Sequence, residues 1–253
     1  MGSSAARDRP LAEAGLVFGV IAALTAALDA LAPRVGLADH EHLLVGALFL
    51  WTALHLAQRQ PDGLARYGLG LGGLLEPMQP DAPPGLGGAA LDLLRALRHA
   101  APAALRETGV ALAVAALIFP PFVVGFRLWH QPTVGFEWIT PADPVGYLLG
   151  QLLVVGLPEE ALFRGYFQGR LADGWPTTRR LLGVALSPGA WLGQAVLFAL
   201  LHFAVDPNPV RLAVFFPGLA FGWLRAWRGG IGAAIVFHAL SNLLSDILVR
   251  GWL

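Results

Sequence analysis

The chain has 253 residues, of which 56% are hydrophobic and only 13% are charged, whereas about a quarter of the residues in a soluble domain carry charge. The formal net charge is zero and no basic run is present, which excludes nucleic acid as a partner because phosphate binding needs a concentrated cationic face. The absence of cysteine excludes disulfides, thiolate nucleophiles and cysteine zinc sites. Any catalysis must therefore use His, carboxylate or hydroxyl side chains.

Apolar runs follow one another along the chain, several of them near the roughly 20 residues that cross a bilayer. They cover residues 12–32, 42–57, 108–126, 145–169, 189–205, 209–227 and 230–249. Backbone amides in lipid must bond within their own segment, so these runs are expected to be helices. The predicted fold class is all-α, a multi-pass transmembrane bundle of about seven helices in one integral membrane domain over residues 1–253. The second run is short and carries His55, so it is expected to be tilted or to lie between other helices.

The first run has two interpretations. Arg7 and Arg9 precede it and Ala30-Leu31-Ala32 ends it, which is the pattern of a cleaved signal peptide. Asp29 interrupts the presumed cleavage region, and more apolar runs follow. These two features favour retention of the run as the first transmembrane helix.

Residues 58–107 are the main extramembrane piece, predicted to be a cytoplasmic loop. Its first part is rich in Gly and Pro, which disfavours a stable helix. From Ala90 to Leu105, leucines recur on one side while Asp92, Arg95 and Arg98 lie largely on the other. This pattern predicts an interfacial amphipathic helix on the membrane surface, with a helix packed against the bundle as the alternative.

The arginines are distributed unevenly between the two sides of the predicted bundle. With the amino terminus in the cytoplasm, the inner arginines outnumber the outer ones, which is the asymmetry that the positive-inside rule describes. The inner set is Arg7, Arg9, Arg59, Arg66, Arg95, Arg98, Arg106, Arg170, Arg179, Arg180, Arg225 and Arg228, and the outer set is Arg34, Arg127, Arg211 and Arg250. The lysine-free, alanine-rich composition is typical of a bacterial protein, so the expected location is the inner (cytoplasmic) membrane.

Ionisable side chains lie inside the predicted spans, where each costs a few kcal/mol and is normally paired or functional. The fourth run contains the adjacent Glu159 and Glu160 followed by Arg164. Glu160 and Arg164 share a helix face and can pair, whereas Glu159 points about 100° away. A carboxylate outside the ion pair in a low-dielectric site suits a general base.

The fifth and seventh runs carry the remaining candidates. His202 lies in the fifth, and His238 and Asn242 lie one turn apart in the seventh. Peptide hydrolysis by activated water needs a base, a group that holds the water and donors for the oxyanion. Glu159 suits the first role, His202 the second, and His238 with Asn242 the third. The alternative is that these polar groups only pack helices against one another.

The three motifs resemble those of the CAAX prenyl protease and bacteriocin-processing (CPBP) family, also called the Abi family. Its pattern is EExxxR, then FxxxH, then HxxxN or HxxxD, and here EEALFR occupies 159–164, FALLH 198–202 and HALSN 238–242. The resemblance covers residues 145–245, and the predicted catalytic core spans 145–249.

The resemblance implies an all-helical intramembrane endopeptidase of the glutamic type. Glu159 and His202 would activate water, His238 and Asn242 would form the oxyanion site, and Glu160 with Arg164 would support the geometry. No cofactor is expected. From the residues alone one Glu with two His could bind zinc, but HExxH is absent, so a metal-free site is favoured.

The resemblance also implies the partners. The expected substrate is a prenylated, processed or membrane-anchored protein or peptide within the lipid bilayer, and a bacterial myxosortase-like subgroup that trims membrane anchors is one candidate. Two alternatives stay open. One is a non-proteolytic membrane chaperone or bacteriocin-immunity protein of the same fold. The other is a small transporter, which predicts inverted repeats that the sequence does not display.

Overall fold

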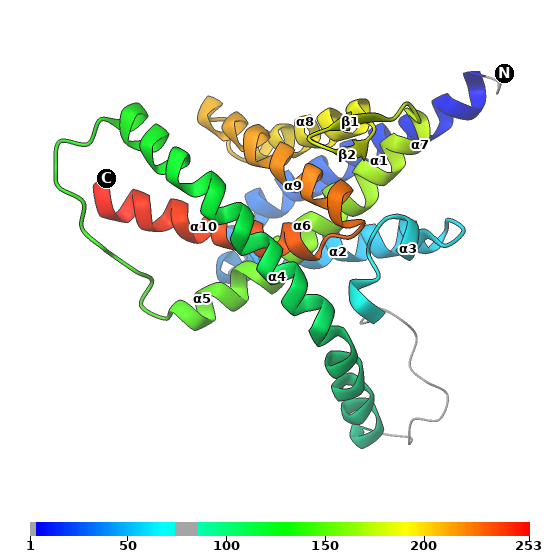
Figure 1. Cartoon of the computed structure of the whole chain (residues 1–253), viewed down its shortest axis with the longest axis horizontal. Helices are drawn as coiled ribbons and strands as arrows, with labels where there is room; N and C mark the ends of the chain where they lie inside the picture. Colours follow the sequence, from blue (N-terminus) through cyan, green and yellow to red (C-terminus); the bar gives the residue numbers. More distant parts are fainter. Residues whose placement is uncertain (1–3, 74–85) are drawn as a thin grey trace. The chain divides into compact units, whose positions relative to one another are not determined.

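A computed structural model describes the chain over residues 4–73 and 86–253 (Figure 1). Nearly all of its elements are helical. The α-helices are α1 (Ser4–Leu31), α2 (Glu41–Gln58), α3 (Gly63–Arg66), α4 (Leu86–His130), α5 (Pro144–Gly150), α6 (Leu157–Glu160), α7 (Gln168–Gly174), α8 (Pro188–Val205), α9 (Phe215–Arg228) and α10 (Gly232–Trp252). The 3-10 helices are η1 (Ala32–Val35), η2 (Ala38–His40), η3 (Leu71–Gly73) and η6 (Pro209–Val214), and the π-helices are η4 (Gln151–Gly156) and η5 (Ala161–Phe167).

The predicted all-α membrane bundle is confirmed. Among the described residues, five helical segments are long and apolar enough to cross a membrane. They are Arg9–Val35, Ala90–His130, Pro144–Gly174, Pro188–Val205 and Gly232–Trp252. The count is five rather than about seven. The predicted second span is α2, whose apolar character is diluted by Glu41, His42 and His55, and the predicted sixth span is α9, which has only 14 residues.

The described residues form two compact units. The first unit consists of the described residues before Leu71 together with Leu157–Ile231. The second unit consists of the described residues of Leu71–Gly156 together with Gly232–Leu253. The predicted site residues are divided between them. Glu159, Glu160, Arg164 and His202 belong to the first unit, and His238 and Asn242 belong to the second.

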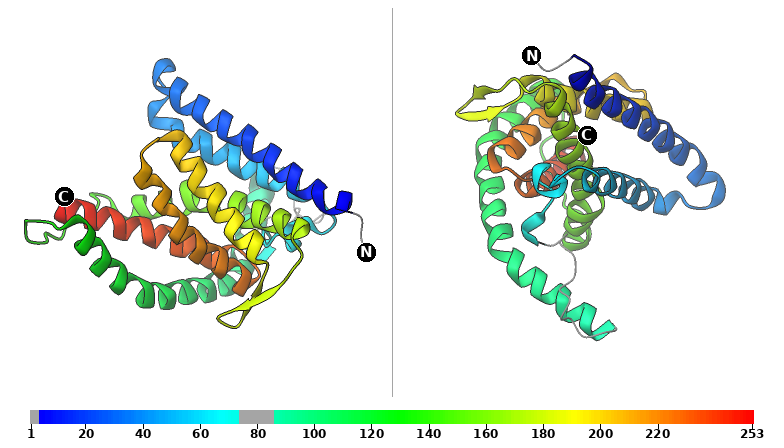
Figure 2. Two further views of the ribbon diagram at one scale, coloured as in Figure 1. Left: turned by 90° about the horizontal axis from the view of Figure 1, so that it is seen from above. Right: turned by 90° about the vertical axis from the view of Figure 1, so that its right-hand side faces the viewer.

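The first unit is built around η5, whose seven residues are all buried. A helix that is buried on every side needs partners on every side, and aromatic rings supply several of them. Phe163 packs edge-on against Phe49 of α2 at 6.2 Å and against Phe198 of α8 at 5.0 Å, and Phe167 meets Phe18 of α1 at 6.2 Å. Figures 1 and 2 show α8 and α9 lying side by side in this unit. The glutamate motif is thus held in the centre of the unit.

The second unit consists mainly of α4, α5, η4 and α10. The rings of Phe119 in α4 and Phe237 in α10 stack at 5.6 Å. On α4, large apolar side chains such as Leu117 (76% exposed) and Leu128 (70% exposed) face outward. Exposure of this kind over a 45-residue helix is expected where lipid is the solvent.

The predicted interfacial helix and the predicted third span are one continuous helix, α4. Residues 106 and 107, which separate the two predicted elements, are Arg and Glu. Neither type breaks a helix as Gly or Pro would, so the helix continues through them. Pro102, Pro120 and Pro121 lie inside α4, and each removes one backbone hydrogen bond. Figure 2 shows the resulting curvature. The interfacial position of its amino-terminal half stays a prediction.

A short β-hairpin joins α7 to α8, where no strand was predicted from the sequence. β1 (Arg179–Leu181) pairs with β2 (Val184–Leu186) in the antiparallel register that sets Leu181 opposite Val184. The turn residues Leu182 and Gly183 both have positive φ, 49° and 82°, which is the conformation of a tight hairpin turn. The hairpin lies between two candidate membrane spans.

Candidate active site

The acidic pair lies between two π-helical segments. η4 (Gln151–Gly156) precedes the single turn of α6 that carries Glu159 and Glu160, and η5 (Ala161–Phe167) follows it. A π turn widens the backbone and is frequent at functional positions. The backbone therefore departs from regular α geometry on both sides of the acidic pair.

Glu160 and Arg164 form the pair that their spacing predicts. The Arg164 Nη1 donates to Glu160 Oε1 at 3.0 Å, and both side chains are 0% exposed. Removal of two charges from water is costly and is offset only by good pairing geometry. Glu160 thus neutralises the charge of Arg164. The role of Glu159 in proton transfer stays a prediction.

Aromatic rings hold the rest of the Arg164 guanidinium. Its central carbon lies 4.1 Å from the centre of the Phe198 ring and 4.8 Å from the centre of the Phe221 ring. Such contacts stabilise a desolvated cation by about 2 kcal/mol. A side chain at Gly218 would lie 3.3 Å from Arg164 Nη2, so the absence of a side chain there leaves room for the guanidinium.

His202 is oriented by its own helix. Its Nδ1 lies 2.9 Å from the Phe198 carbonyl oxygen, and because a carbonyl can only accept, Nδ1 carries the hydrogen. In the neutral imidazole, Nε2 is then the acceptor. The Phe198 ring packs edge-on against His202 at 4.5 Å between ring centres. The first and last residues of FALLH are therefore joined by a backbone hydrogen bond and by ring packing.

Glu159 is half-buried, in contrast to the fully buried Glu160. One of its carboxylate oxygens, Oε2, is buried. The side chain is thus partly accessible and partly desolvated. A general base needs accessibility of this kind, because the substrate and the water must reach it.

In the second unit, α10 carries the third motif. His238 is 3% exposed, and Asn242 donates from Nδ2 to Gln151 Oε1 of η4 at 2.7 Å. Ser241 donates its hydroxyl to the Phe237 carbonyl at 2.7 Å, so this hydroxyl is used within its own helix. The carboxamide of Asn242 is therefore fixed by a partner from another element.

Gln151 was not among the residues singled out from the sequence. It is a polar residue inside the fourth apolar run, eight positions before Glu159, and an amide at that depth requires a partner. That requirement was the available signal. The partner could not be inferred, because it lies 91 positions further along the chain.

The structure brings Glu160, Arg164 and His202 into one packed cluster through Phe198. It fixes Asn242 separately, in the second unit. That the acidic pair, His202, His238 and Asn242 share one buried pocket, with a water molecule between Glu159 and His202, stays a prediction.

Within the described residues, no group of three or more His, Asp or Glu side chains is arranged to hold a metal ion. The expectation of a site without a cofactor stays untested by this observation, and a chelation experiment below addresses it.

Comparison with known families gives one match. Residues 141–244 match the model of the family described as Type II CAAX prenyl endopeptidase Rce1-like. The matched segment contains all three motifs, at 159–164, 198–202 and 238–242. No curated protein and no solved structure gave a significant match. The myxosortase-like subgroup stays a prediction. Residues 141–244 of this membrane protein are therefore similar to the Rce1-like CAAX prenyl endopeptidase family, which is the resemblance that the three motifs predicted.

Proposed function

We propose that the protein is an intramembrane endopeptidase that hydrolyses a peptide bond of a membrane-anchored protein with water activated by Glu159 and His202. The family match and the apolar helices support the class of activity and the lipid environment. The roles of individual residues are part of the proposal.

In the proposed reaction, His202 Nε2 accepts a hydrogen bond from the water and Glu159 takes its proton. The hydroxide oxygen attacks the carbonyl carbon of the scissile bond, and the carbonyl oxygen becomes an oxyanion. Glu159 then returns the proton to the amide nitrogen as the carbon–nitrogen bond breaks. The Nδ1 hydrogen bond of His202 to the Phe198 carbonyl supports this role because it leaves Nε2 as an acceptor.

His238 and Asn242 are the proposed donors to the oxyanion. The Asn242 amide has two hydrogens, and Gln151 accepts from its nitrogen at 2.7 Å. One hydrogen is therefore held by Gln151, which fixes the direction of the other. Fixed donors of this kind lower the barrier because they need no rearrangement as charge develops.

The contacts of Phe198 are the observation that carries the proposal. Its ring covers the Arg164 guanidinium at 4.1 Å and packs against His202 at 4.5 Å. The glutamate motif and the histidine motif are thus parts of one cluster rather than two separate packing features.

The test uses Glu159→Gln in the full-length protein in lipid nanodiscs, with Glu137→Gln as control because Glu137 is exposed. Both are assayed on a farnesylated CAAX reporter peptide and on an unmodified membrane-anchored peptide. We expect cleavage of at least one reporter by the control and a loss of about a thousandfold or more for Glu159→Gln. Unchanged cleavage by Glu159→Gln contradicts the proposed base.

A single turnover in water enriched in oxygen-18 separates direct attack by water from a covalent route. Direct attack puts one solvent oxygen into the new carboxylate in the first turnover. An enzyme oxygen in the first product would instead show a covalent intermediate on Glu159 that water hydrolyses at the Glu159 carbonyl carbon.

Chelation tests the proposed metal-free chemistry. Dialysis against a strong chelator is expected to leave the cleavage rate unchanged. A loss that zinc restores would make Glu159 and the two histidines ligands instead.

A further inference from the structure

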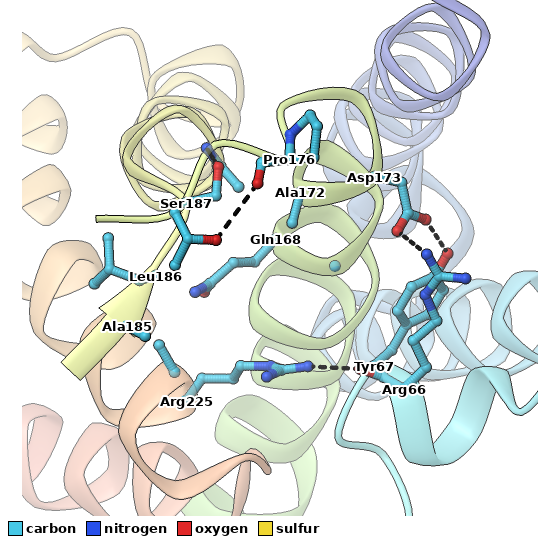
Figure 3. A pocket seen from close by; sticks show the side chains of 14 residues that line it. Arg66, Tyr67, Gln168, Ala172, Asp173, Pro176, Ala185, Leu186, Ser187 and Arg225 are labelled. Carbon is cyan, nitrogen blue, oxygen red and sulfur yellow. Dashed lines mark hydrogen bonds and ion pairs between the residues drawn. The ribbon is translucent and has the colours of Figure 1, made fainter. Parts of the chain in front are cut away.

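The first unit contains a cavity of about 370 Å³ (Figure 3). Its volume falls within the range typical of small-molecule sites. None of the six predicted site residues lines it. Its walls come from the segment before η3, from α7 and the loop after it, from β2 and the start of α8, and from the end of α9. Its polar lining residues are Arg66, Tyr67, Gln168, Asp173, Thr178, Ser187 and Arg225.

Arg225 is a cation without a carboxylate partner in the part of the chain that the structure describes. Its Nη2 donates to the Arg66 carbonyl oxygen at 3.0 Å, whereas its Nε is buried and has no hydrogen-bond partner among these residues. Figure 3 shows the side chain crossing the cavity from α9 toward Arg66. A guanidinium in this situation favours an anionic oxygen as partner, because a buried charge left unpaired costs several kcal/mol.

Gln168 supplies an acceptor to the same cavity. It is 7% exposed, and its Nε2 donates to the Gly222 carbonyl oxygen at 2.9 Å. That bond fixes which end of the amide is oxygen, and this Oε1 is buried without a partner among the described residues. Figure 3 shows Gln168 between Ser187 and Arg225. Two residues that line the cavity thus have a buried polar atom without a partner among the described residues, a donor on Arg225 and an acceptor on Gln168.

Asp173 also lines the cavity, and its charge is already compensated. Its carboxylate accepts from Arg66, from Arg170 at 3.3 Å and from the Tyr67 hydroxyl at 3.1 Å. A ligand anion would therefore meet Arg225 without strong repulsion from this carboxylate.

The cavity lies where candidate membrane-crossing helices end. The segment Pro144–Gly174 finishes in its wall and the segment Pro188–Val205 begins there. The ends of membrane-spanning helices lie at the depth of the lipid headgroups. Basic pockets between such helices bind phosphate-bearing headgroups.

We propose that this cavity binds a phosphate group that carries a neighbouring hydroxyl, as in the headgroup of phosphatidylglycerol. A phosphate oxygen accepts from the guanidinium of Arg225, and the neighbouring hydroxyl pairs with the side-chain amide of Gln168. Membrane lipid and a free glycerol phosphate share this chemistry, and the experiment separates the two sources. Because the site uses none of the six predicted catalytic residues, its failure leaves the proposed endopeptidase function unaffected.

The test compares the full-length wild type, Arg225→Gln, Ala185→Phe and Arg211→Gln. Ala185 is exposed on the hairpin and lines the cavity, so phenylalanine there fills the site with little demand on the fold. Arg211 is an exposed cation paired with Asp206 and is the charge-matched control. Lipid retention is measured by native mass spectrometry after extraction from a 1:1 mixture of phosphatidylglycerol and phosphatidylcholine. Thermal midpoints are measured in detergent with glycerol 1-phosphate.

We expect the wild type and Arg211→Gln to retain phosphatidylglycerol in at least tenfold preference, and Arg225→Gln and Ala185→Phe to lose that preference. A rise in thermal midpoint with glycerol 1-phosphate alone, abolished by the same two variants, would assign the site to the free compound. No preference in the wild type together with no thermal shift overturns the proposal. A preference that survives both variants overturns it as well.

Discussion

The buried Glu160–Arg164 pair makes the largest residue-scale demand on stability. Replacement of Arg164 by leucine leaves Glu160 charged and fully buried, which costs about 3–5 kcal/mol. Arg250→Leu is the matched control, because Arg250 and Asp246 have the same spacing of four residues but are partly exposed, where a pair contributes less than about 1 kcal/mol. Thermal unfolding in detergent is expected to show a large drop for the first variant and a small one for the second. Equal drops would contradict the account of this pair.

Gln151 is expected to act as a positioning residue for Asn242. Gln151→Leu removes the acceptor 2.7 Å from Asn242 Nδ2, so the carboxamide can rotate away from the oxyanion. The expected result is a fall in kcat of about tenfold with KM unchanged, because a misplaced group costs the transition state more than substrate binding. Gln151→Glu keeps an acceptor oxygen and is expected to restore most of kcat. Equal losses in both variants would indicate a packing role only.

Tyr67 provides a prediction for alkaline pH. Burial, reinforced by the neighbouring Asp173 carboxylate, raises the pKa of Tyr67 from 10.0 to about 12. Since the folded state holds this proton more tightly, the contribution to stability is fully present below about pH 10 and is lost as the pH rises through about 12. The difference in phenolate absorbance between the wild type and Tyr67→Phe is expected to titrate near pH 12. A midpoint near pH 10 would show that the hydroxyl is not buried against Asp173.

At the scale of elements, the close approach of η4 and α10 depends on Gly156. A Cβ at this position would lie 2.9 Å from the Gln151 carbonyl oxygen and 3.3 Å from that of Ile235. Gly156→Ala is therefore expected to destabilise the protein by about 1–3 kcal/mol and to lower kcat by displacing Gln151. Gly150→Ala is the control, because a Cβ at Gly150 meets nothing within 4 Å. Comparable effects of the two substitutions would contradict this packing.

The helices and strands also show which parts of the fold could be predicted from the sequence. Apolar run length predicted α1, α8 and α10 closely because the bilayer imposes one helix length on each run. The same argument overestimated the length of α9, because the apolar run there is divided between the 3-10 helix η6 and a 14-residue α-helix. The hairpin at Arg179–Leu186 was missed because its two strands have three residues each.

Within the site, local spacing was sufficient only for contacts along one helix. The Glu160–Arg164 pair follows from the helical repeat, as does the contact of Phe198 with His202. The contact of Phe198 with Arg164 and that of Asn242 with Gln151 join distant parts of the chain. Such contacts depend on how the helices pack in three dimensions. The periodicity of a single sequence does not show which helices are neighbours.

At the scale of the whole molecule, the arginine distribution predicts a cytoplasmic amino terminus. The chain has no cysteine, so single introduced cysteines report topology directly. Leu182 (85% exposed) and Val134 (62% exposed) are suitable positions, one in the hairpin and one in the loop after α4. We expect an impermeant maleimide to label Val134→Cys in intact spheroplasts and Leu182→Cys only after lysis. The reverse pattern would invert the predicted orientation.

The measurement that tests the central claim most directly is a comparison of membrane proteomes from cells whose sole copy is wild type, Glu159→Gln or Glu137→Gln. The account predicts that one or more membrane proteins keep an extra terminal segment in the Glu159→Gln cells and are trimmed in the other two. Identical protein termini in all three, with the variant proteins present at equal levels in the membrane, would contradict hydrolysis by Glu159.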